Sequence, residues 1–341
     1  MKPEKQALRI GAAALLCALL LRLFTSGTFA QAVSALSSPE LISFVLYLET
    51  GRLYRPVVPE DATTPETVEQ TQTLPEETLP EIDAPAQAVF APEDALLVDV
   101  NSVCGYPADT QALLGQPLSW DLTASEPTVL ILHSHATESY ENTENYTPSG
   151  DYRTLDANYN MVSVGAYLTQ LLEEAGVNVL HDTTLHDYPS YSNSYNESRS
   201  AAKAYLEQYP SIRLVLDLHR DSVATTSGKQ LGYTVSTSQG TAAQLMLVVG
   251  TNASGLNHPN WYENLSLAVK LHAQLEKQCP GICRPISFRS QRFNQDLSPG
   301  ALLIEVGAAG NTRQEALLAA QHLAQTIISM SGGAVTANPT S

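Results

Sequence analysis

Three short apolar runs constrain the fold of this chain more than any other feature. They span residues 128–132, 212–218 and 301–304 and contain few polar residues. Runs of this length that are rich in Val, Ile and Leu are typical of strands covered on both faces. Such strands belong at the centre of a sheet, between two layers of helices.

Helical patterns alternate with these runs. Residues 158–175 carry apolar side chains at helical spacing, and Gly176 follows them where a helix C-cap belongs. Further helices are predicted at 198–208, 261–277 and 312–330, and further strands at 177–180, 231–235 and 244–249. The alternation predicts an α/β fold class, a three-layer domain with a central, mostly parallel or mixed sheet flanked by helices.

The acidic charge of the chain is concentrated in one stretch. The formal net charge is −17. Between Pro56 and Tyr152 the sequence has 18 Asp and Glu and no Lys or Arg, so the other 17 acidic residues are matched by all 18 basic ones. The chain has no segment basic enough to favour binding to nucleic acid.

The N-terminus is typical of an export signal or a membrane anchor. Three basic residues in the first nine positions precede an apolar run at 10–21, which has the length of a signal-peptide core. Residues 1–31 fit two interpretations. One is a signal peptide that is cleaved off, and the other is an uncleaved membrane anchor that spans residues 7–24. In either case we expect the bulk of the protein outside the cytoplasm.

Four further segments are expected after this one. Residues 32–55 contain a short amphipathic helix just outside the membrane. Residues 56–94 are rich in Pro, Glu and Thr and predict an extended acidic linker, because they cannot bury enough apolar surface to fold. The main domain is expected at 95–333 and a C-terminal tail at 334–341.

Two of the four cysteines lie close together. Cys279 and Cys283 bracket a Pro-Gly-Ile turn. Outside the cytoplasm such a pair is expected to form a small disulfide that closes the loop. A cysteine-based metal site is the weaker interpretation, because the neighbouring sequence offers no further ligands.

Polar side chains follow the three apolar runs where each strand is expected to end. His133, His135 and Glu138 follow the first run, His219 follows the second and Glu305 follows the third. In α/β sheets, ligands bind at the carboxyl ends of the strands. We therefore expect these side chains to meet in one site.

This set of residues suits a catalytic zinc ion. Such an ion takes three protein ligands from His and carboxylate side chains and leaves one position for water, whose pKa it lowers to about 7. We predict His135, Glu138 and His219 as the Zn²⁺ ligands, because His135 and Glu138 are three residues apart. Glu305, a carboxylate that would be costly to bury without a role, is the predicted general base.

Other interpretations of these residues stay open. A histidine at a strand end is commonly a hydrogen-bonded structural residue, and His133 is either that or a partner of a ligand. Asp221 is a candidate for orienting His219. The alternatives for the carboxylate ligand are Glu141, Glu144 and Asp151.

Several runs of sequence fit one known family. They are 133–140 (His-Ser-His-Ala-Thr-Glu-Ser-Tyr), 181–184, 217–221 (Asp-Leu-His-Arg-Asp), 258–261 and 294–307. Through these runs, and through 47–52 near the membrane segment, the chain resembles the stage II sporulation protein P family.

The resemblance implies a zinc-dependent N-acetylmuramoyl-L-alanine amidase with an amidase (phosphorylase/hydrolase-like) fold, acting on peptidoglycan in septal wall thinning and engulfment. It also implies endopeptidase activity on cross-linked stem peptides, and a lytic transglycosylase and a membrane scaffold protein as partners. It favours an uncleaved, single-pass anchor in the cell membrane at the sporulation septum. By analogy His135, His219 and Glu305 belong to the site, whereas Glu138 rests on local spacing alone.

In the amidase hypothesis a donor, Arg220 or Asn294, helps zinc to stabilise the oxyanion while Glu305 moves the proton. A zinc carboxypeptidase-like wall peptidase stays open as an alternative, with Arg220, Arg289 or Arg292 for the terminal carboxylate. A metal-free wall-binding scaffold on the same fold stays open too. A serine hydrolase is disfavoured, because the sequence has no Gly-x-Ser-x-Gly motif.

Overall fold

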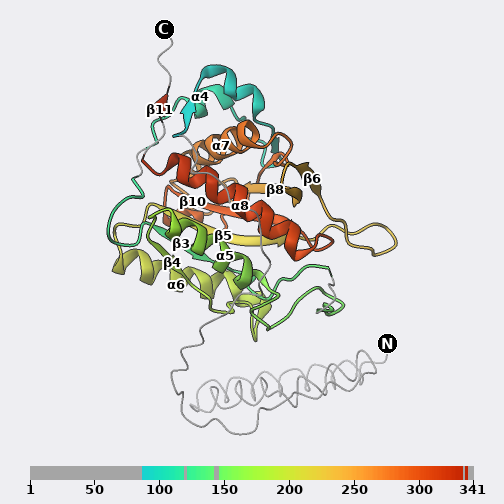
Figure 1. Ribbon diagram of the computed structural model, residues 1–341. Coiled ribbons are helices and arrows are strands. Elements are labelled where there is room, and N and C mark those ends of the chain that lie inside the picture. Colours follow the sequence, from blue (N-terminus) through green and yellow to red (C-terminus); the bar gives the residue numbers. More distant parts are fainter. Residues whose placement is uncertain (1–86, 119–120, 142–145, 333–334, 337–341) are drawn as a thin grey trace, which may run out of the picture. The chain divides into compact units, whose positions relative to one another are not determined.

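A seven-stranded sheet lies at the centre of the protein. The structure is a computed structural model that describes residues 87–118, 121–141, 146–332 and 335–336 (Figure 1). The strand order is β2-β9-β8-β10-β5-β3-β4. The bounds are β2 (Val100–Ser102), β3 (Val129–Leu132), β4 (Val179–His181), β5 (Leu214–Asp221), β8 (Leu245–Val249), β9 (Ile286–Phe288) and β10 (Ala301–Ala308). Only β8 and β10 are antiparallel neighbours, so the sheet is mixed and mostly parallel, as predicted.

Helices cover both faces of this sheet. They are α5 (Met161–Glu174), α6 (Ser194–Gln208), α7 (Trp261–Gln278) and α8 (Arg313–Met330), and the short helix α4 (Thr110–Leu114) packs on α7 (Figure 1). Val129 and Ile131 of β3 belong to a core shared with α5, α7 and α8, whereas Leu130 and Leu132 belong to a core shared with α6. Alternate side chains of a strand point to opposite faces. The three-layer prediction is therefore confirmed.

Local sequence signals set the ends of two long helices. The Asn160 side chain accepts a hydrogen bond from the Val162 N–H at the start of α5, and Gly176 follows its C-cap residue with a φ of 82°. At the start of α8, Thr312 and Glu315 each accept a hydrogen bond from the other's backbone N–H. The predicted starts and ends of these helices hold to within three residues.

Two strands extend further than the sequence indicated. β5 includes His219 and β10 includes Glu305, so these side chains lie within strands and not after them. The prediction ended each strand at the last apolar residue of its run, whereas backbone pairing continues past that residue. The strand expected at 231–235 is instead β6 (Thr234–Thr237), which forms a separate hairpin with β7 (Gly240–Ala243).

Ordered elements begin before residue 95, where the main domain was expected to start. β1 (Val89–Phe90) pairs with β11 (Val335–Thr336), and the short helix η1 (Pro92–Leu97) follows β1. Asp94 of η1 is buried and lies 2.8 Å from the Lys277 ammonium of α7. This ion pair anchors a segment whose composition alone indicated a linker.

Several predictions lie outside the described residues. They are the membrane segment at 1–31, the amphipathic helix at 32–55 and most of the linker at 56–94. Among the described residues, no helix combines the length and the apolar character needed to cross a bilayer.

The loop between the two neighbouring cysteines is closed by a carboxylate. Cys279 and Cys283 are free thiols, so the expected disulfide is absent from this structure. The Glu276 side chain accepts hydrogen bonds from the backbone N–H groups of Gly281 and Cys283, at 2.8 and 2.7 Å. These two bonds hold the turn in place of a disulfide.

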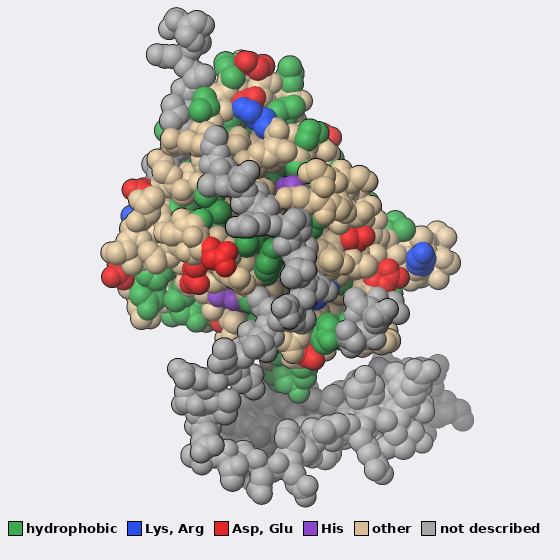
Figure 2. Space-filling model, viewed as in Figure 1, with side chains coloured by type: hydrophobic (Ala, Val, Ile, Leu, Met, Phe, Trp, Pro, Cys, Tyr) green, Lys and Arg blue, Asp and Glu red, His purple; other side chains and the backbone are tan. Residues whose placement is uncertain are grey.

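Basic side chains are sparse on the described surface. On the face shown in Figure 2, Lys and Arg side chains stand apart from one another among acidic and uncharged groups. That part of the described surface therefore offers a polyanion no continuous cationic patch.

Candidate metal and catalytic site

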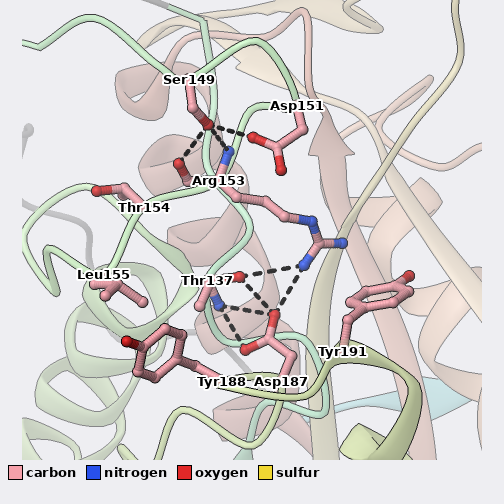
Figure 3. A pocket seen from close by; sticks show the side chains of 9 residues that line it. All are labelled: Thr137, Ser149, Asp151, Arg153, Thr154, Leu155, Asp187, Tyr188 and Tyr191. Carbon is pink, nitrogen blue, oxygen red and sulfur yellow. Dashed lines mark hydrogen bonds and ion pairs between the residues drawn. The ribbon is translucent and has the colours of Figure 1, made fainter. Parts of the chain in front are cut away.

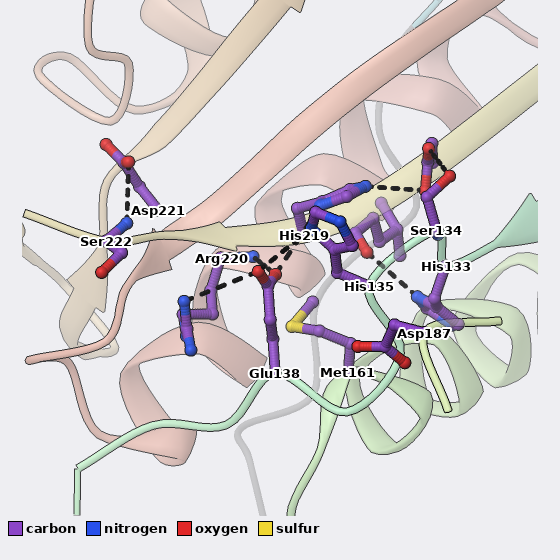
Figure 4. Close-up of polar contacts among 12 residues, drawn as sticks. His133, Ser134, His135, Glu138, Met161, Asp187, His219, Arg220, Asp221 and Ser222 are labelled. Carbon is purple, nitrogen blue, oxygen red and sulfur yellow. Dashed lines mark hydrogen bonds and ion pairs between the residues drawn. The ribbon is translucent and has the colours of Figure 1, made fainter. Parts of the chain in front are cut away.

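Two imidazoles and one carboxylate converge at the edge of the sheet where β3 ends. His135 and Glu138 lie in the turn after β3, and His219 lies on the neighbouring strand β5. Ligand atoms of the three lie within 4.8 Å of one another. Each oxygen of Glu138 faces one imidazole, with His135 Nδ1 at 3.4 Å from Oε1 and His219 Nδ1 at 3.6 Å from Oε2 (Figure 4). This donor set fits a zinc ion with an open coordination position.

Glu138 is held in the charged form that metal binding requires. Burial alone would raise its pKa, but the hydrogen bond with His135 and the charge of Arg220 outweigh burial and hold the pKa well below its usual range. The backbone N–H of Arg220 donates to Oε2 at 3.1 Å, and Arg153 Nη2 donates to Oε1 at 3.3 Å. Of the alternative carboxylates, Glu141 and Asp151 do not join the three-residue group, and Glu144 lies outside the described residues.

A buried carboxylate sets the orientation of His219. Asp217, two residues earlier on β5, places Oδ1 at 2.9 Å from His219 Nε2, which leaves Nδ1 facing Glu138. Ser134 fixes Asp217 in turn through its backbone N–H at 2.7 Å and its hydroxyl at 2.6 Å. Burial opposes the charge on His219, but Asp217 outweighs it and raises the pKa of His219 to about 9. The orienting role expected for Asp221 falls to Asp217, since Asp221 pairs with Arg284 at 2.8 Å.

Glu305 lies beside the cluster on the adjacent strand. In the β10–β5 register it pairs with His219. Its Oε2 is buried and has no hydrogen-bond partner within the described part of the chain. Burial, together with the negative charge of Glu138, raises the pKa of Glu305 well above its usual value. A carboxyl group with a pKa of about 8 is partly ionised near neutral pH, so it can accept a proton as a base and then return that proton as an acid.

Both predicted oxyanion donors are hydrogen-bonded to backbone carbonyls of the surrounding loops. The Arg220 guanidinium is buried and donates to the Ser139 and Tyr152 carbonyls at 2.9 and 2.8 Å. The Asn294 amide donates to the Tyr195 carbonyl at 2.8 Å and accepts from Arg199 at 3.3 Å. Both side chains hold loops around the site together.

Two tyrosines that were not predicted as site residues contact the histidines. The Tyr191 ring stacks on His135 with centroids 4.5 Å apart, and the Tyr195 ring lies 5.5 Å from His135 and 6.4 Å from His219. Burial raises the pKa of Tyr195, so its phenol keeps its proton. No described residue takes a hydrogen bond from that hydroxyl. Tyr191 and Tyr195 are four residues apart, a spacing that places two side chains on one face of a helix. The predicted helix began only at residue 198, so this spacing was not used.

His133 lies behind the cluster and not within it. Its Nε2 lies 2.9 Å from His181 Nε2, and its Nδ1 lies 3.1 Å from the Leu218 carbonyl. Burial lowers the pKa of His133 to about 4 and that of His181 to about 3. The pair packs against Gly165 of α5, where a Cβ would come within 2.6 Å of the two Nε2 atoms. His133 therefore supports the end of β3 through a neutral, buried contact.

Comparisons with known proteins agree on one family. The model of the stage II sporulation protein P family matches residues 54–328. The stage II sporulation protein P of Bacillus subtilis (strain 168) is 29% identical over 227 residues, which cover 61% of this chain and 52% of the relative. The match thus spans about half the length of that relative.

Two solved structures have a partly similar fold. The N-acetylmuramoyl-L-alanine amidase AmiC2 of Nostoc punctiforme has a TM-score of 0.37 and 14% identity, over 60% of this chain and 97% of that one. The CwlD amidase of Clostridioides difficile, solved in complex with the GerS lipoprotein, has a TM-score of 0.36 and 13% identity, over 60% and 93%. Likeness at this level does not indicate what this chain acts on.

Proposed function

The chain belongs to the stage II sporulation protein P family, and from that premise we propose that it is a zinc-dependent peptidoglycan hydrolase of sporulation. The reaction is hydrolysis of the amide between N-acetylmuramic acid and L-alanine, with cross-linked stem peptides as a second substrate. The observation that carries the proposal is the convergence of His135, Glu138 and His219 within 4.8 Å. No other group of three or more His, Cys, Asp or Glu in the described part of the chain is placed to hold a metal.

The chemistry of the site follows from its residues. A zinc ion held by His135, Glu138 and His219 would lower the pKa of a water and polarise the scissile carbonyl. Glu305, buried beside His219, accepts the proton of the attacking water and delivers it to the leaving amine as the C–N bond breaks. Tyr195, whose hydroxyl no described residue occupies, replaces Arg220 and Asn294 as the donor to the carbonyl oxygen.

The expected location and partners belong to the same proposal. Residues 1–31 would anchor the chain in the cell membrane at the sporulation septum, with the catalytic domain outside the cytoplasm. A lytic transglycosylase and a membrane scaffold protein are the proposed partners, as the resemblance to the family implies.

The test is product analysis with the full chain purified in detergent. Muropeptides are digested with and without a chelator, products are identified by mass spectrometry, and zinc content is measured. Chelator-sensitive release of stem peptides with a free L-alanine amine supports the amidase. Release of single C-terminal amino acids would support the carboxypeptidase-like alternative, and absence of both zinc and products would leave a wall-binding scaffold.

A further inference from the structure

A cavity of 530 Å³ opens beside the candidate metal site (Figure 3). It shares Arg153 and Tyr191 with that site, because Arg153 donates to Glu138 and Tyr191 stacks on His135. The mechanism proposed above uses neither side chain. The cavity is lined by Thr137, Ser149, Asp151, Arg153, Thr154, Leu155, Asp187, Tyr188 and Tyr191.

The guanidinium of Arg153 has donors to spare. Of its five N–H groups, Nη1 donates to Asp187 at 2.8 Å and Thr137 at 3.2 Å, and Nη2 donates to Glu138 at 3.3 Å. No described residue accepts from Nε or from the second Nη2–H. Figure 3 shows the Nη1 side directed at Asp187 and Thr137, with the other nitrogens turned away from them. Two adjacent N–H groups of this kind match the two oxygens of a carboxylate.

The position of Arg153 is fixed before any ligand arrives. Its partner Asp187 has no exposed side-chain surface and accepts the Thr137 hydroxyl at 2.6 Å. The Arg153 guanidinium also lies 4.4 Å from the centre of the Tyr191 ring. An arginine held in this way loses little side-chain entropy on binding a ligand.

The rest of the cavity wall suits a chain with both apolar and polar parts. Leu155 and Tyr188 are 50% and 58% exposed, and Asp151 and Ser149 are exposed and hydrogen-bonded to each other. Exposed apolar side chains around a cavity mark a place where a ligand is covered. The charged arginine at the end nearest the site and the apolar rim together fit a peptide better than a neutral sugar.

The geometry points to a peptide subsite in this cavity, in which Arg153 binds a free carboxylate close to the scissile amide. This inference rests on the proposed function. The arginines considered from sequence, Arg220, Arg289 and Arg292, are not among the residues that line this cavity. Arg153 is a specificity residue in this scheme, and Leu155 and Tyr188 contact the aliphatic part of the peptide.

Two tripeptides test the inference. One is L-Ala-γ-D-Glu-L-Lys, whose glutamyl α-carboxylate is free, and the other carries a carboxamide at that position. Dissociation constants are measured by calorimetry on the full chain, with and without added zinc. We expect the carboxamide to bind about 10-fold more weakly to the unsubstituted protein and equally well to Arg153→Gln.

A matched control exists in the same protein. Arg284 lies 2.8 Å from Asp221 and 4.0 Å from the centre of the Tyr233 ring, much as Arg153 meets Asp187 and Tyr191. Arg284→Gln should keep the preference for the carboxylate. Arg153→Lys keeps the positive charge but not the two parallel N–H groups of the guanidinium, so it should keep only part of the preference for the carboxylate. This variant also keeps the inference testable if Arg153→Gln does not fold.

Three outcomes overturn the inference: an unchanged carboxylate preference in Arg153→Gln, no binding of either peptide, or a fall in kcat without any change in KM or in that preference. The last would place Arg153 on the reacting carbonyl. Absence of zinc and of cleavage products refutes the proposed function instead, because the peptide preference is measured by binding alone.

Discussion

Asp217→Asn isolates the contribution of one carboxylate to metal binding. The change keeps the size of the side chain and removes the charge that lies 2.9 Å from His219 Nε2. Replacing a carboxylate that orients a histidine ligand commonly weakens metal binding about 10- to 100-fold, or about 1.4 to 2.7 kcal/mol. We expect a loss of zinc affinity in this range once His219 is free of its proton.

The same carboxylate makes the loss depend on pH. Asp217 raises the pKa of His219 to about 9. At pH 7, zinc binding to the unsubstituted protein must therefore remove a proton from His219 about two pH units below its pKa, which costs roughly 2.7 kcal/mol of binding free energy. In Asp217→Asn the pKa returns toward about 6.5, and this cost largely disappears. The affinity difference should therefore be largest near pH 9 and shrink toward pH 7.

The assay is competition for zinc with a chelator of known affinity, at several pH values between 7 and 9. Asp221→Asn is the matched control, because Asp221 lies on the same strand and pairs with Arg284 instead. It should bind zinc as the unsubstituted protein does. Equal zinc affinity of Asp217→Asn and the unsubstituted protein at pH 9, or a loss that does not vary with pH, would refute the reasoning.

Three further predictions concern proton transfer, a buried lysine and a buried histidine. Glu305→Gln should keep its zinc content while muropeptide cleavage falls at least about 100-fold, measured by product release. Lys270→Met should lower the free energy of unfolding by about 1–3 kcal/mol in urea, because the buried ammonium donates to the Leu113 and Leu114 carbonyls at 2.9 and 2.7 Å. Burial, with the neighbouring His133, lowers the pKa of His181 to about 3. Below pH 6.5, His181 therefore becomes protonated in the unfolded chain but stays neutral in the folded protein. Stability should thus fall as the pH drops, by about 2 kcal/mol for this group at pH 5, and urea titrations of His181→Gln should show a smaller fall.

The sequence was enough to bring His135, Glu138, His219 and Glu305 together. Each lies on or after an apolar run, and parallel strands present their carboxyl ends at one edge of a sheet. The ends of β5 and β10 were placed too early, because the prediction followed hydrophobicity while backbone hydrogen bonds continue through buried polar residues. Backbone pairing with the neighbouring strands keeps His219 inside β5 and Glu305 inside β10, and the local sequence does not indicate that pairing.

Residues contributed by loops were harder to predict. Arg153 is the first basic residue after the long acidic stretch, yet its distance from Glu138 depends on a chain reversal that no local pattern indicates. Tyr191 belongs to the short helix η2 (Tyr191–Asn193), which lies outside every predicted helix and strand. The sequence around Cys279 and Cys283 also did not indicate that Glu276 of α7 accepts hydrogen bonds from the loop between them.

The position of β10 has a consequence for the order in which this protein is made. β10 lies between β5 and β8, so it joins β3, β4 and β5 on one side to β2, β8 and β9 on the other. Yet it is the last strand of this sheet to be synthesised. Until residues 301–308 are present, the sheet consists of two unjoined halves, and the potential ligands lack Glu305 beside them. A chain emerging from the ribosome therefore completes its reactive centre only once residues 301–308 have been added to it.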